Sequence, residues 1–172
     1  MIPRVSIIMG STSDLPVMEE AAKVMEEFEI PFEINALSAH RTPEEVEKYA
    51  KEAYSRGIRI VIAGAGGAAH LPGVMAALFP LPVIGVPCRS SISLDGWDSV
   101  LSILQMPPGI PVATVGLDAA RNAGILALQM LATGDEKMYQ KMISYKASLK
   151  KKIVEANNEL AKISKYKFKC SS

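Results

Sequence analysis

The chain has 172 residues, 49% of them hydrophobic and 22% charged, which is typical of a globular protein large enough to bury a core. Its formal net charge is +1, so no overall field favours nucleic acid or a membrane surface as a partner. Cys88 and Cys170 are far apart and form neither a disulfide framework nor a metal-binding spacing, which favours a reducing cytoplasm.

Targeting signals and membrane spans are not expected. The N-terminal residues lead directly into an apolar strand, without the charged and apolar regions of a secretory leader. No apolar run approaches the ~20 residues that a membrane-spanning helix needs. Residues 1–134 hold 9 basic and 14 acidic side chains, whereas residues 135–172 hold 10 and 4. The positive excess therefore belongs to the C-terminal segment. Because neither a targeting signal nor a membrane span is expected, we expect a soluble, cytoplasmic protein.

The first predicted elements alternate between strand and helix. Residues 5–9 are apolar except for Ser6 and are followed by a glycine, which indicates a buried strand. Residues 14–28 carry apolar side chains at helical spacing. A second strand is expected at 32–37. Thr42 then precedes a proline and two glutamates, a strong start for a helix that is expected to run to about residue 56.

The same alternation continues to the C-terminus. Residues 58–63 are apolar except for Arg59 and rich in β-branched side chains, as expected of a strand covered on both faces. The later predicted elements are helix 69–78, strand 81–86, helix 96–104, strand 111–115, helix 119–132 and a long helix at about 135–163. Strands alternating with helices form parallel sheets between helical layers. We therefore predict an α/β fold, a three-layer αβα sandwich with a flavodoxin-like five-stranded parallel sheet. Residues 1–164 are expected to form one catalytic domain, and residues 165–172 a flexible basic tail.

Polar and glycine-rich loops follow the predicted strands. In an open parallel sheet these loops emerge at the carboxyl edge, where ligands bind. The loops are residues 10–14, 38–43, 64–72, 87–93 and 105–109. The topology therefore predicts one ligand site to which several of these loops contribute.

The loop at residues 10–14 is rich in hydroxyl groups and precedes a helix. Backbone N–H groups and the positive end of the following helix make such a turn suitable for an anion. Ser13 and Asp14 are also ordinary helix caps, so a structural role competes with the functional one. The sequence Gly-Lys-Ser/Thr of a P-loop does not follow.

The two histidines, His40 and His70, are both predicted on carboxyl-edge loops. Histidine is the side chain best suited to proton transfer near neutral pH, and Arg41 offers a planar cation for phosphate or carboxylate. The alternative for each is a packing role, which we favour for His70. Two lone histidines and scattered carboxylates do not form a metal-binding spacing, so no metal is expected.

Three glycines, Gly64, Gly66 and Gly67, occur where the third strand meets the next helix. They permit either close backbone approach to a ligand or tight packing of the strand against the helix. Their spacing does not match the dinucleotide-binding pattern. The serines at 90–93 and the segment around Gln105 and Met106 are predicted as loops that lie over a ligand or as proline-held surface loops.

Five motifs together resemble one family. They are Gly10-Ser11-Thr12-Ser13-Asp14, Ser38-Ala39-His40-Arg41-Thr42-Pro43, Ala63 to Gly73, Pro82 to Pro87, and Ser102 to Pro107. The chain resembles the bacterial N5-carboxyaminoimidazole ribonucleotide mutases of purine biosynthesis, in the class I phosphoribosylaminoimidazole carboxylase family, from residue 3 to about 132.

The resemblance implies an octameric, cytoplasmic isomerase that needs no metal, ATP or biotin. Such an enzyme moves a carboxylate from the exocyclic nitrogen of an aminoimidazole ribonucleotide to ring carbon 4. His40 matches the family's proton carrier, Arg41 suits the phosphate, and Asp14 suits the ribose hydroxyls. The full set of expected substrate contacts is Gly10, Ser11, Ser13, Asp14, Ser38, Arg41, Gly64, Ala65, Gly66, Gly67, His70, Leu71, Gln105 and Met106.

Two alternatives remain at this point. A related branch carboxylates aminoimidazole ribonucleotide with free carbon dioxide, and it usually carries lysine where Arg41 stands and a different loop at residues 64–70. A non-enzymatic phosphate- or flavin-binding module on the same fold is an alternative of another class.

Overall fold

A single parallel sheet organises the N-terminal part of the chain. The computed structural model of the protein describes residues 1–167 and 169. Five parallel strands lie in the order β2-β1-β3-β4-β5, the order of flavodoxin-like sheets. The strands are β1 (Val5–Met9), β2 (Phe32–Ala36), β3 (Ile60–Gly66), β4 (Val83–Cys88) and β5 (Ala113–Thr114). The predicted sheet is confirmed.

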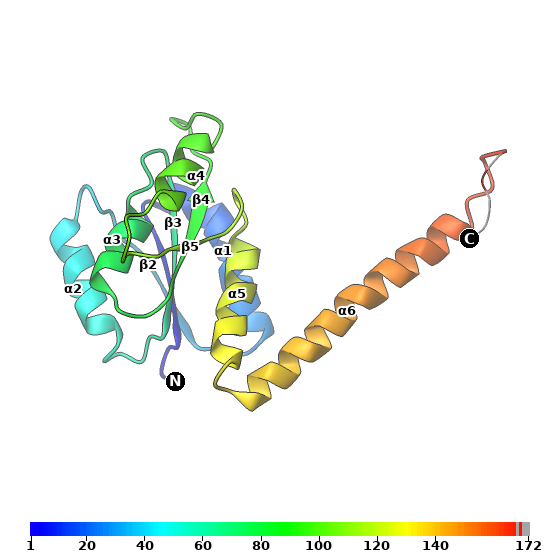
Figure 1. Ribbon diagram of the computed structural model, residues 1–172, viewed down its shortest axis with the longest axis horizontal. Coiled ribbons are helices and arrows are strands. Elements are labelled where there is room, and N and C mark those ends of the chain that lie inside the picture. The colour runs from blue at the N-terminus through cyan, green and yellow to red at the C-terminus, as the bar shows by residue number, and fades with distance from the viewer. Residues whose placement is uncertain (168, 170–172) are drawn as a thin grey trace. The chain divides into compact units, whose positions relative to one another are not determined.

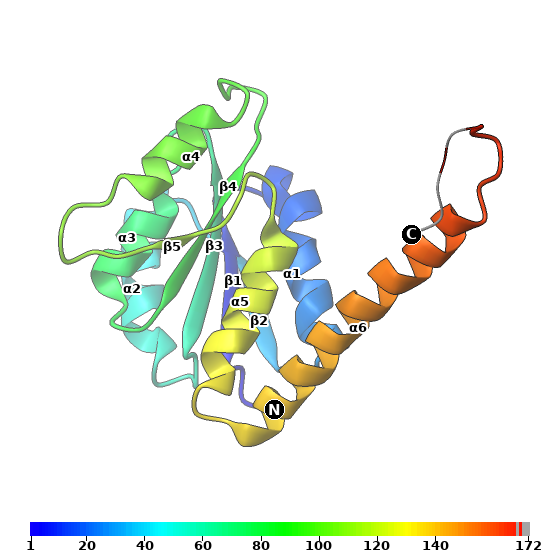
Figure 2. The same cartoon turned by 45° about the vertical axis from the view of Figure 1, so that its right-hand side comes forward.

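Helices cover both faces of this sheet. They are the short 3-10 helix η1 (Thr12–Asp14), α1 (Leu15–Glu27), α2 (Pro43–Ala53), α3 (Leu71–Leu78), α4 (Trp97–Leu104) and α5 (Ala120–Ala132). In both views α2, α3 and α4 lie on one face, while α1 and α5 lie on the other (Figures 1 and 2). Gly124 of α5 packs on Val24 of α1, because a Cβ at Gly124 would lie only 2.9 Å from Val24 Cβ. The three-layer sandwich is therefore as predicted.

The central strands carry the core. Every residue of β1 is buried, as is every residue of β4 and all of β3 except Gly66. The largest side chains with no exposed surface include Ile7, Ile8 and Ile62. Burying apolar surface of this kind is the main force that holds such a domain together, and it fixes the carboxyl edge of the sheet in place.

The third and fourth strands end later than expected. β3 ends at Gly66 instead of residue 63, and β4 ends at Cys88 instead of residue 86. Glycine and proline usually mark strand ends, but here Ala65 pairs with Pro87. The carbonyl of Pro87 faces the β5 side, where it accepts a hydrogen bond from the Asp118 N–H at 2.8 Å. The pairing with β5 covers only Ile84 and Gly85, so the missing N–H of Pro87 removes no strand–strand bond.

The chain divides into two compact units, Met1–Met130 and Leu131–Ser172. The second unit contains the end of α5 and the long helix α6 (Glu136–Ala161), which begins where the Asp135 carboxylate accepts the Met138 N–H at 3.1 Å. Among the described residues, no helix is both long and apolar enough to cross a membrane. The single catalytic domain at 1–164 stays a prediction, as does the tail at 165–172, of which residues 168 and 170–172 lie outside the described part.

Candidate active site

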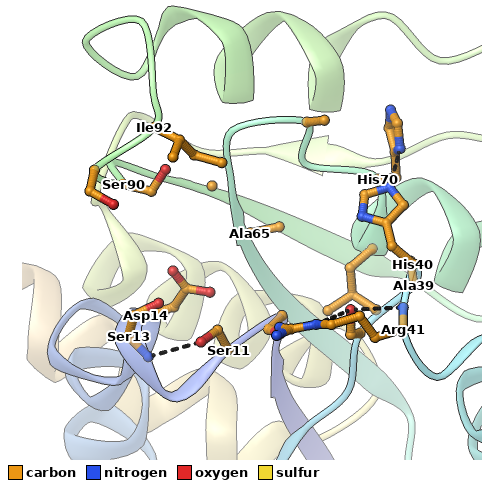
Figure 3. Close-up of a pocket in the computed structure, with 16 residues that line it drawn as sticks. Ser11, Ser13, Asp14, Ala39, His40, Arg41, Ala65, His70, Ser90 and Ile92 are labelled. Atoms are coloured by element: carbon orange, nitrogen blue, oxygen red, sulfur yellow. Dashed lines mark hydrogen bonds between the residues drawn. The ribbon is translucent and has the colours of Figure 1, made fainter.

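A cavity of about 460 Å³ lies at the carboxyl edge of the sheet, among the loops that follow β1, β2, β3 and β4 (Figure 3). Its position is the one that the topology predicts. The lining residues are Gly10, Ser11, Ser13, Asp14, Ser38, Ala39, His40, Arg41, Ala65, Gly66, Ala68, His70, Leu71, Ser90, Ser91 and Ile92.

The loop after β1 presents hydroxyl groups and one buried carboxyl group to the cavity. The Gly10 N–H donates to the Gly64 carbonyl at 3.1 Å, which joins the start of the loop to β3. Ser11 caps η1, because its Oγ accepts the Ser13 N–H at 3.3 Å. Asp14 is only 6% exposed. Burial raises the pKa of its carboxyl group above the usual range, against the smaller effect of a backbone hydrogen bond at Ser11.

The turn after β2 is closed by its own side chains. The Ser38 N–H donates to Thr42 Oγ1, and that hydroxyl donates to the Ser38 carbonyl, both at 3.1 Å. Thr42 occupies the N-cap position of α2, as expected, but its side chain makes no bond to that helix. It stabilises instead the five-residue turn, Ser38 to Thr42, that carries His40 and Arg41.

Arg41 is held against the loop after β1. Its Nη2 donates to the Gly10 carbonyl at 3.1 Å, and its Nε donates to Ser38 Oγ at 3.3 Å. The same Ser38 oxygen accepts the Arg41 backbone N–H at 3.2 Å. Within the described part of the chain, Arg41 forms no salt bridge with a carboxylate. Its positive charge therefore lies beside the hydroxyls of Ser11 and Ser13 without an internal counter-ion.

The two histidines meet across the cavity edge. His40 Nε2 lies 2.7 Å from His70 Nδ1, and the ring planes are 76° apart (Figure 3). A hydrogen bond of this kind needs one nitrogen as donor and the other as acceptor, so the two facing nitrogens share one proton. Both side chains are exposed. Sequence reasoning favoured a packing role for His70, whereas this contact places it directly beside the candidate proton carrier.

Four predicted contact residues do not line the cavity. Gly64 lies within β3, where a Cβ would approach Met18 Sδ to 2.2 Å, so packing explains this glycine. Gly67 adopts a φ of +60°, a left-handed conformation that favours glycine. Gln105 and Met106 follow α4, and Met106 packs on Gly73 of α3, whose Cβ position is 2.8 Å from the sulfur. Their assignment as substrate contacts stays a prediction.

Five lining residues were not among the predicted contacts. Ala39 and Ala68 are small apolar residues next to predicted ones, and their composition carries no chemical signal. Ser90, Ser91 and Ile92 belong to the loop after β4, which the topology places at the same edge. The sequence offered this loop as one that lies over a ligand or on the surface, but no residue in it was chosen as a contact.

The end of β4 also contains Cys88, whose thiol is an obvious candidate nucleophile. Burial raises the pKa of this thiol to about 12, and the negative charges of Asp14 and Asp118 add to the effect. Because the thiolate is the reactive form, Cys88 is inert at neutral pH. Residues 1–167 and 169 also contain no group of three His, Cys, Asp or Glu side chains placed to hold a metal ion.

The arrangement joins two kinds of chemistry in one cavity. Arg41 and the hydroxyls after β1 form a region suited to a phosphate group. The histidine pair, the buried carboxyl group and small apolar residues such as Ala65 form the rest of the lining. The cavity can therefore bind an anionic ligand and exchange protons with the part of it that lies beside His40.

Comparison with known proteins gives consistent matches. The family model described as AIR carboxylase matches residues 4–152. An N5-carboxyaminoimidazole ribonucleotide mutase from Pyrococcus abyssi is 59% identical over 150 residues, which cover 87% of this chain and 86% of that protein. A phosphoribosylaminoimidazole carboxylase from Candida glabrata is 52% identical over 166 residues, which cover 96% of this chain but 29% of that protein. The crystal structure of Treponema denticola PurE2-S38D superimposes with a TM-score of 0.83 at 32% identity, covering 93% of this chain and 99% of that one.

Proposed function

The chain belongs to the AIR carboxylase family, and on that basis we propose that it is a mutase that converts N5-carboxyaminoimidazole ribonucleotide to 4-carboxy-5-aminoimidazole ribonucleotide in purine biosynthesis. The observation that carries the proposal is the histidine pair, which lies at one cavity with the unneutralised cation of Arg41. A phosphorylated substrate whose other end undergoes proton transfer matches that combination.

Binding of the ribonucleotide follows from the charges along the cavity. The guanidinium group of Arg41, with the hydroxyls of Ser11 and Ser13, binds the phosphate. The buried carboxyl group of Asp14 accepts hydrogen bonds from the ribose hydroxyls. These contacts place the aminoimidazole ring beside His40 and the Ala65–Gly66 backbone. Such positioning turns a reaction between two species into one within a single complex, which is a large part of catalysis.

The proton chemistry requires one group that acts as acid and then as base. His40 donates a proton to the exocyclic nitrogen, and the N–CO₂ bond breaks to give carbon dioxide and the electron-rich aminoimidazole. Ring carbon 4 then attacks the retained carbon dioxide. His40 finally removes the proton from carbon 4 and returns to its starting protonation state. The hydrogen bond between His70 and His40 keeps the imidazole of His40 oriented during both transfers.

Carbon dioxide must stay in the cavity between the two steps. Ala39, Ala65, Ala68, Leu71 and Ile92 supply an apolar lining that excludes water when substrate fills the remaining space. Loss of carbon dioxide would uncouple the reaction and release aminoimidazole ribonucleotide.

Direct carboxylation of aminoimidazole ribonucleotide is the rival activity within the family. Arg41 and the glycine-alanine loop favour the mutase. The test incubates the purified protein with each ribonucleotide, with and without bicarbonate. We expect the protein to convert N5-carboxyaminoimidazole ribonucleotide, which is a carbamate, without added bicarbonate. Turnover of aminoimidazole ribonucleotide at low bicarbonate, with none of the carbamate, would refute the mutase assignment.

A homo-octamer that works in the cytoplasm completes the proposal. Large apolar side chains are exposed along α4 and the loop before it, including Leu94, Trp97, Leu101 and Leu104, and an assembly would cover such a surface. Light scattering after size exclusion is expected to give the mass of eight 18.5 kDa chains. A monomer at micromolar concentration would contradict the octamer.

A further inference from the structure

The hydroxyl of Ser90 is buried in the free protein and has no hydrogen-bond partner among the described residues. Buried hydroxyl groups are nearly always paired, because leaving one unpaired costs the free energy of its lost hydration. None of the described polar side chains at the cavity shares this property. The exception therefore needs a physical explanation.

Ser90 lies against the end of β3 at a position that a glycine keeps open. A Cβ at Gly66 would lie 2.9 Å from Ser90 Cβ, 3.2 Å from Ser90 Oγ and 2.9 Å from the Cys88 carbonyl. Any larger residue at 66 would push the loop after β4 away from the cavity. The glycine thus allows the Ser90 hydroxyl to approach the same backbone segment that borders the proposed ring-binding region.

The backbone on both sides of Ser90 is fixed. The Arg89 N–H donates to the Asp118 carboxylate at 2.9 Å. On the other side the Ser93 N–H donates to the Ser90 carbonyl at 3.0 Å, and Ser93 Oγ donates to Asp98 at 2.6 Å. The backbone is therefore ordered in the free protein, so a ligand reaches the buried hydroxyl by rotation of the Ser90 side chain and need not order the loop first.

We propose that Ser90 is a substrate-binding residue that bonds the carboxylated aminoimidazole end of the ribonucleotide and thereby helps to determine specificity; this rests on the mutase function proposed above. The phosphate-binding groups belong to the loops after β1 and β2, whereas Ser90 follows β4 and borders Gly66. Figure 3 shows Ser90 and Arg41 in different parts of the cavity. A hydroxyl both donates and accepts, which suits a carboxylate beside an amine nitrogen.

The experiment compares Ser90→Ala with Ser55→Ala, a matched change at an exposed serine whose Oγ donates to the Glu52 carbonyl at the end of α2. Steady-state turnover of the carbamate is measured beside inhibition by ribose 5-phosphate, which carries the phosphate and sugar but no base. For Ser90→Ala we expect kcat/KM to fall by about tenfold to a hundredfold, as for other lost hydrogen bonds to charged groups. Inhibition by ribose 5-phosphate is expected to stay within about twofold of the unsubstituted protein.

Thermal unfolding separates this role from a structural one. Because the removed hydroxyl has no partner in the free protein, Ser90→Ala is expected to leave the melting temperature unchanged or raise it. A lowered melting temperature with an equal loss for both ligands would overturn the proposal, as would unchanged kcat/KM. If the melting temperature is unchanged and inhibition by ribose 5-phosphate weakens as much as kcat/KM falls, Ser90 bonds the sugar-phosphate instead, and the proposal is overturned as well. An unsubstituted protein that does not turn over the carbamate would reject the mutase function itself, and with it this inference.

Discussion

His40 and His70 are thirty positions apart in the sequence, yet their ring nitrogens are 2.7 Å apart. They meet because β2 and β3 both flank β1 in the sheet, so the loops that follow them converge above its end. Residue type and loop position made His40 a candidate for proton transfer, and the motif resemblance then identified it with the family's proton carrier. It did not predict the contact, because a pairing between two loops depends on the strand order.

Replacing His40 with asparagine tests the proton carrier. Asparagine has a similar size but cannot take up a proton in the range of the reaction. We expect kcat to fall by at least ~10²-fold while the affinity for substrate and the far-UV circular dichroism spectrum remain close to those of the unsubstituted protein. His70→Asn is the companion variant, and because it acts through His40 it should retain more activity. Substantial turnover by His40→Asn would contradict a mechanism based on this histidine.

Replacing Arg41 with alanine tests the phosphate contact. The guanidinium group has no internal salt-bridge partner among the described residues, so its loss should act on the ligand more than on the fold. We expect substrate binding to weaken by ~2–4 kcal/mol, with a smaller effect on kcat. Arg59→Ala, which removes a guanidinium stacked on Tyr54 away from the cavity lining, is the control. Unchanged affinity in equilibrium binding would remove Arg41 from the site.

At the scale of elements, the sequence located the strands and helices well but not the ends of β3 and β4. Gly64 and Pro87 were interpreted as the first residues after their strands, and both lie within them. Local patterns mark these residues as strand breakers because they describe the chain alone. In the structure, Met18 of α1 leaves no room for a side chain at position 64, so a glycine is required there. Pro87 is tolerated because β5 is only two residues long. Both causes come from other elements.

Gly64→Ala tests the packing of β3 on α1. The added methyl group would lie 2.2 Å from Met18 Sδ and 2.8 Å from Met18 Cγ, so the helix or the side chain must move. We expect the free energy of unfolding to fall by about 1–3 kcal/mol, the usual cost of overpacking a core. Urea denaturation measures this change. Gly134→Ala is the matched control, because nothing lies within 4 Å of its new Cβ. Equal stability of the two variants would contradict the tight contact.

At the scale of the whole molecule, the strand–helix alternation was enough to predict the sheet and its layers. It also predicted which edge carries the site, because parallel strands place all their following loops together. Ten of the fourteen expected substrate contacts line the cavity, as does the expected proton carrier His40, whereas Gly64, Gly67, Gln105 and Met106 do not. The predicted residues were chosen for polarity or flexibility. Ala39, Ala68 and Ile92 were missed because an apolar side chain in a loop looks the same whether it faces a ligand or the core.

The stability of the protein should fall in alkali, as the pH rises from about 9 to about 12. Burial and the bond to Glu33 raise the pKa of Tyr49 from 10.0 to about 12, and burial raises that of Cys88 from 9.0 to about 12. Both groups are neutral when protonated. A pKa that is raised in the folded state therefore adds stability at pH values below the pKa of the unfolded chain. That stability is lost as the pH rises towards 12. Urea denaturation at pH 8 and at pH 11 should show the decrease.

The variant Tyr49→Phe identifies the tyrosine's share of this decrease. Phenylalanine removes the hydroxyl that bonds Glu33 and Ser6, so the variant should be less stable at pH 8. Its stability should then change less between pH 8 and pH 11 than that of the unsubstituted protein. If the free energy of unfolding falls by the same amount between pH 8 and pH 11 in both proteins, Tyr49 is excluded as a source of the alkaline loss.

The two unfavourable polar groups at the cavity, the buried carboxyl of Asp14 and the unpaired hydroxyl of Ser90, also affect the heat of binding. The Ser90 hydroxyl has no partner in the free protein, and the Asp14 carboxyl group, which has a backbone hydrogen bond at Ser11, can accept further ones. A ribonucleotide that fills the cavity would form those bonds without breaking existing ones inside the protein. Calorimetry of the interaction should therefore give a favourable enthalpy that exceeds the one expected from the phosphate contact alone. Ligands that carry only a phosphate would release correspondingly less heat.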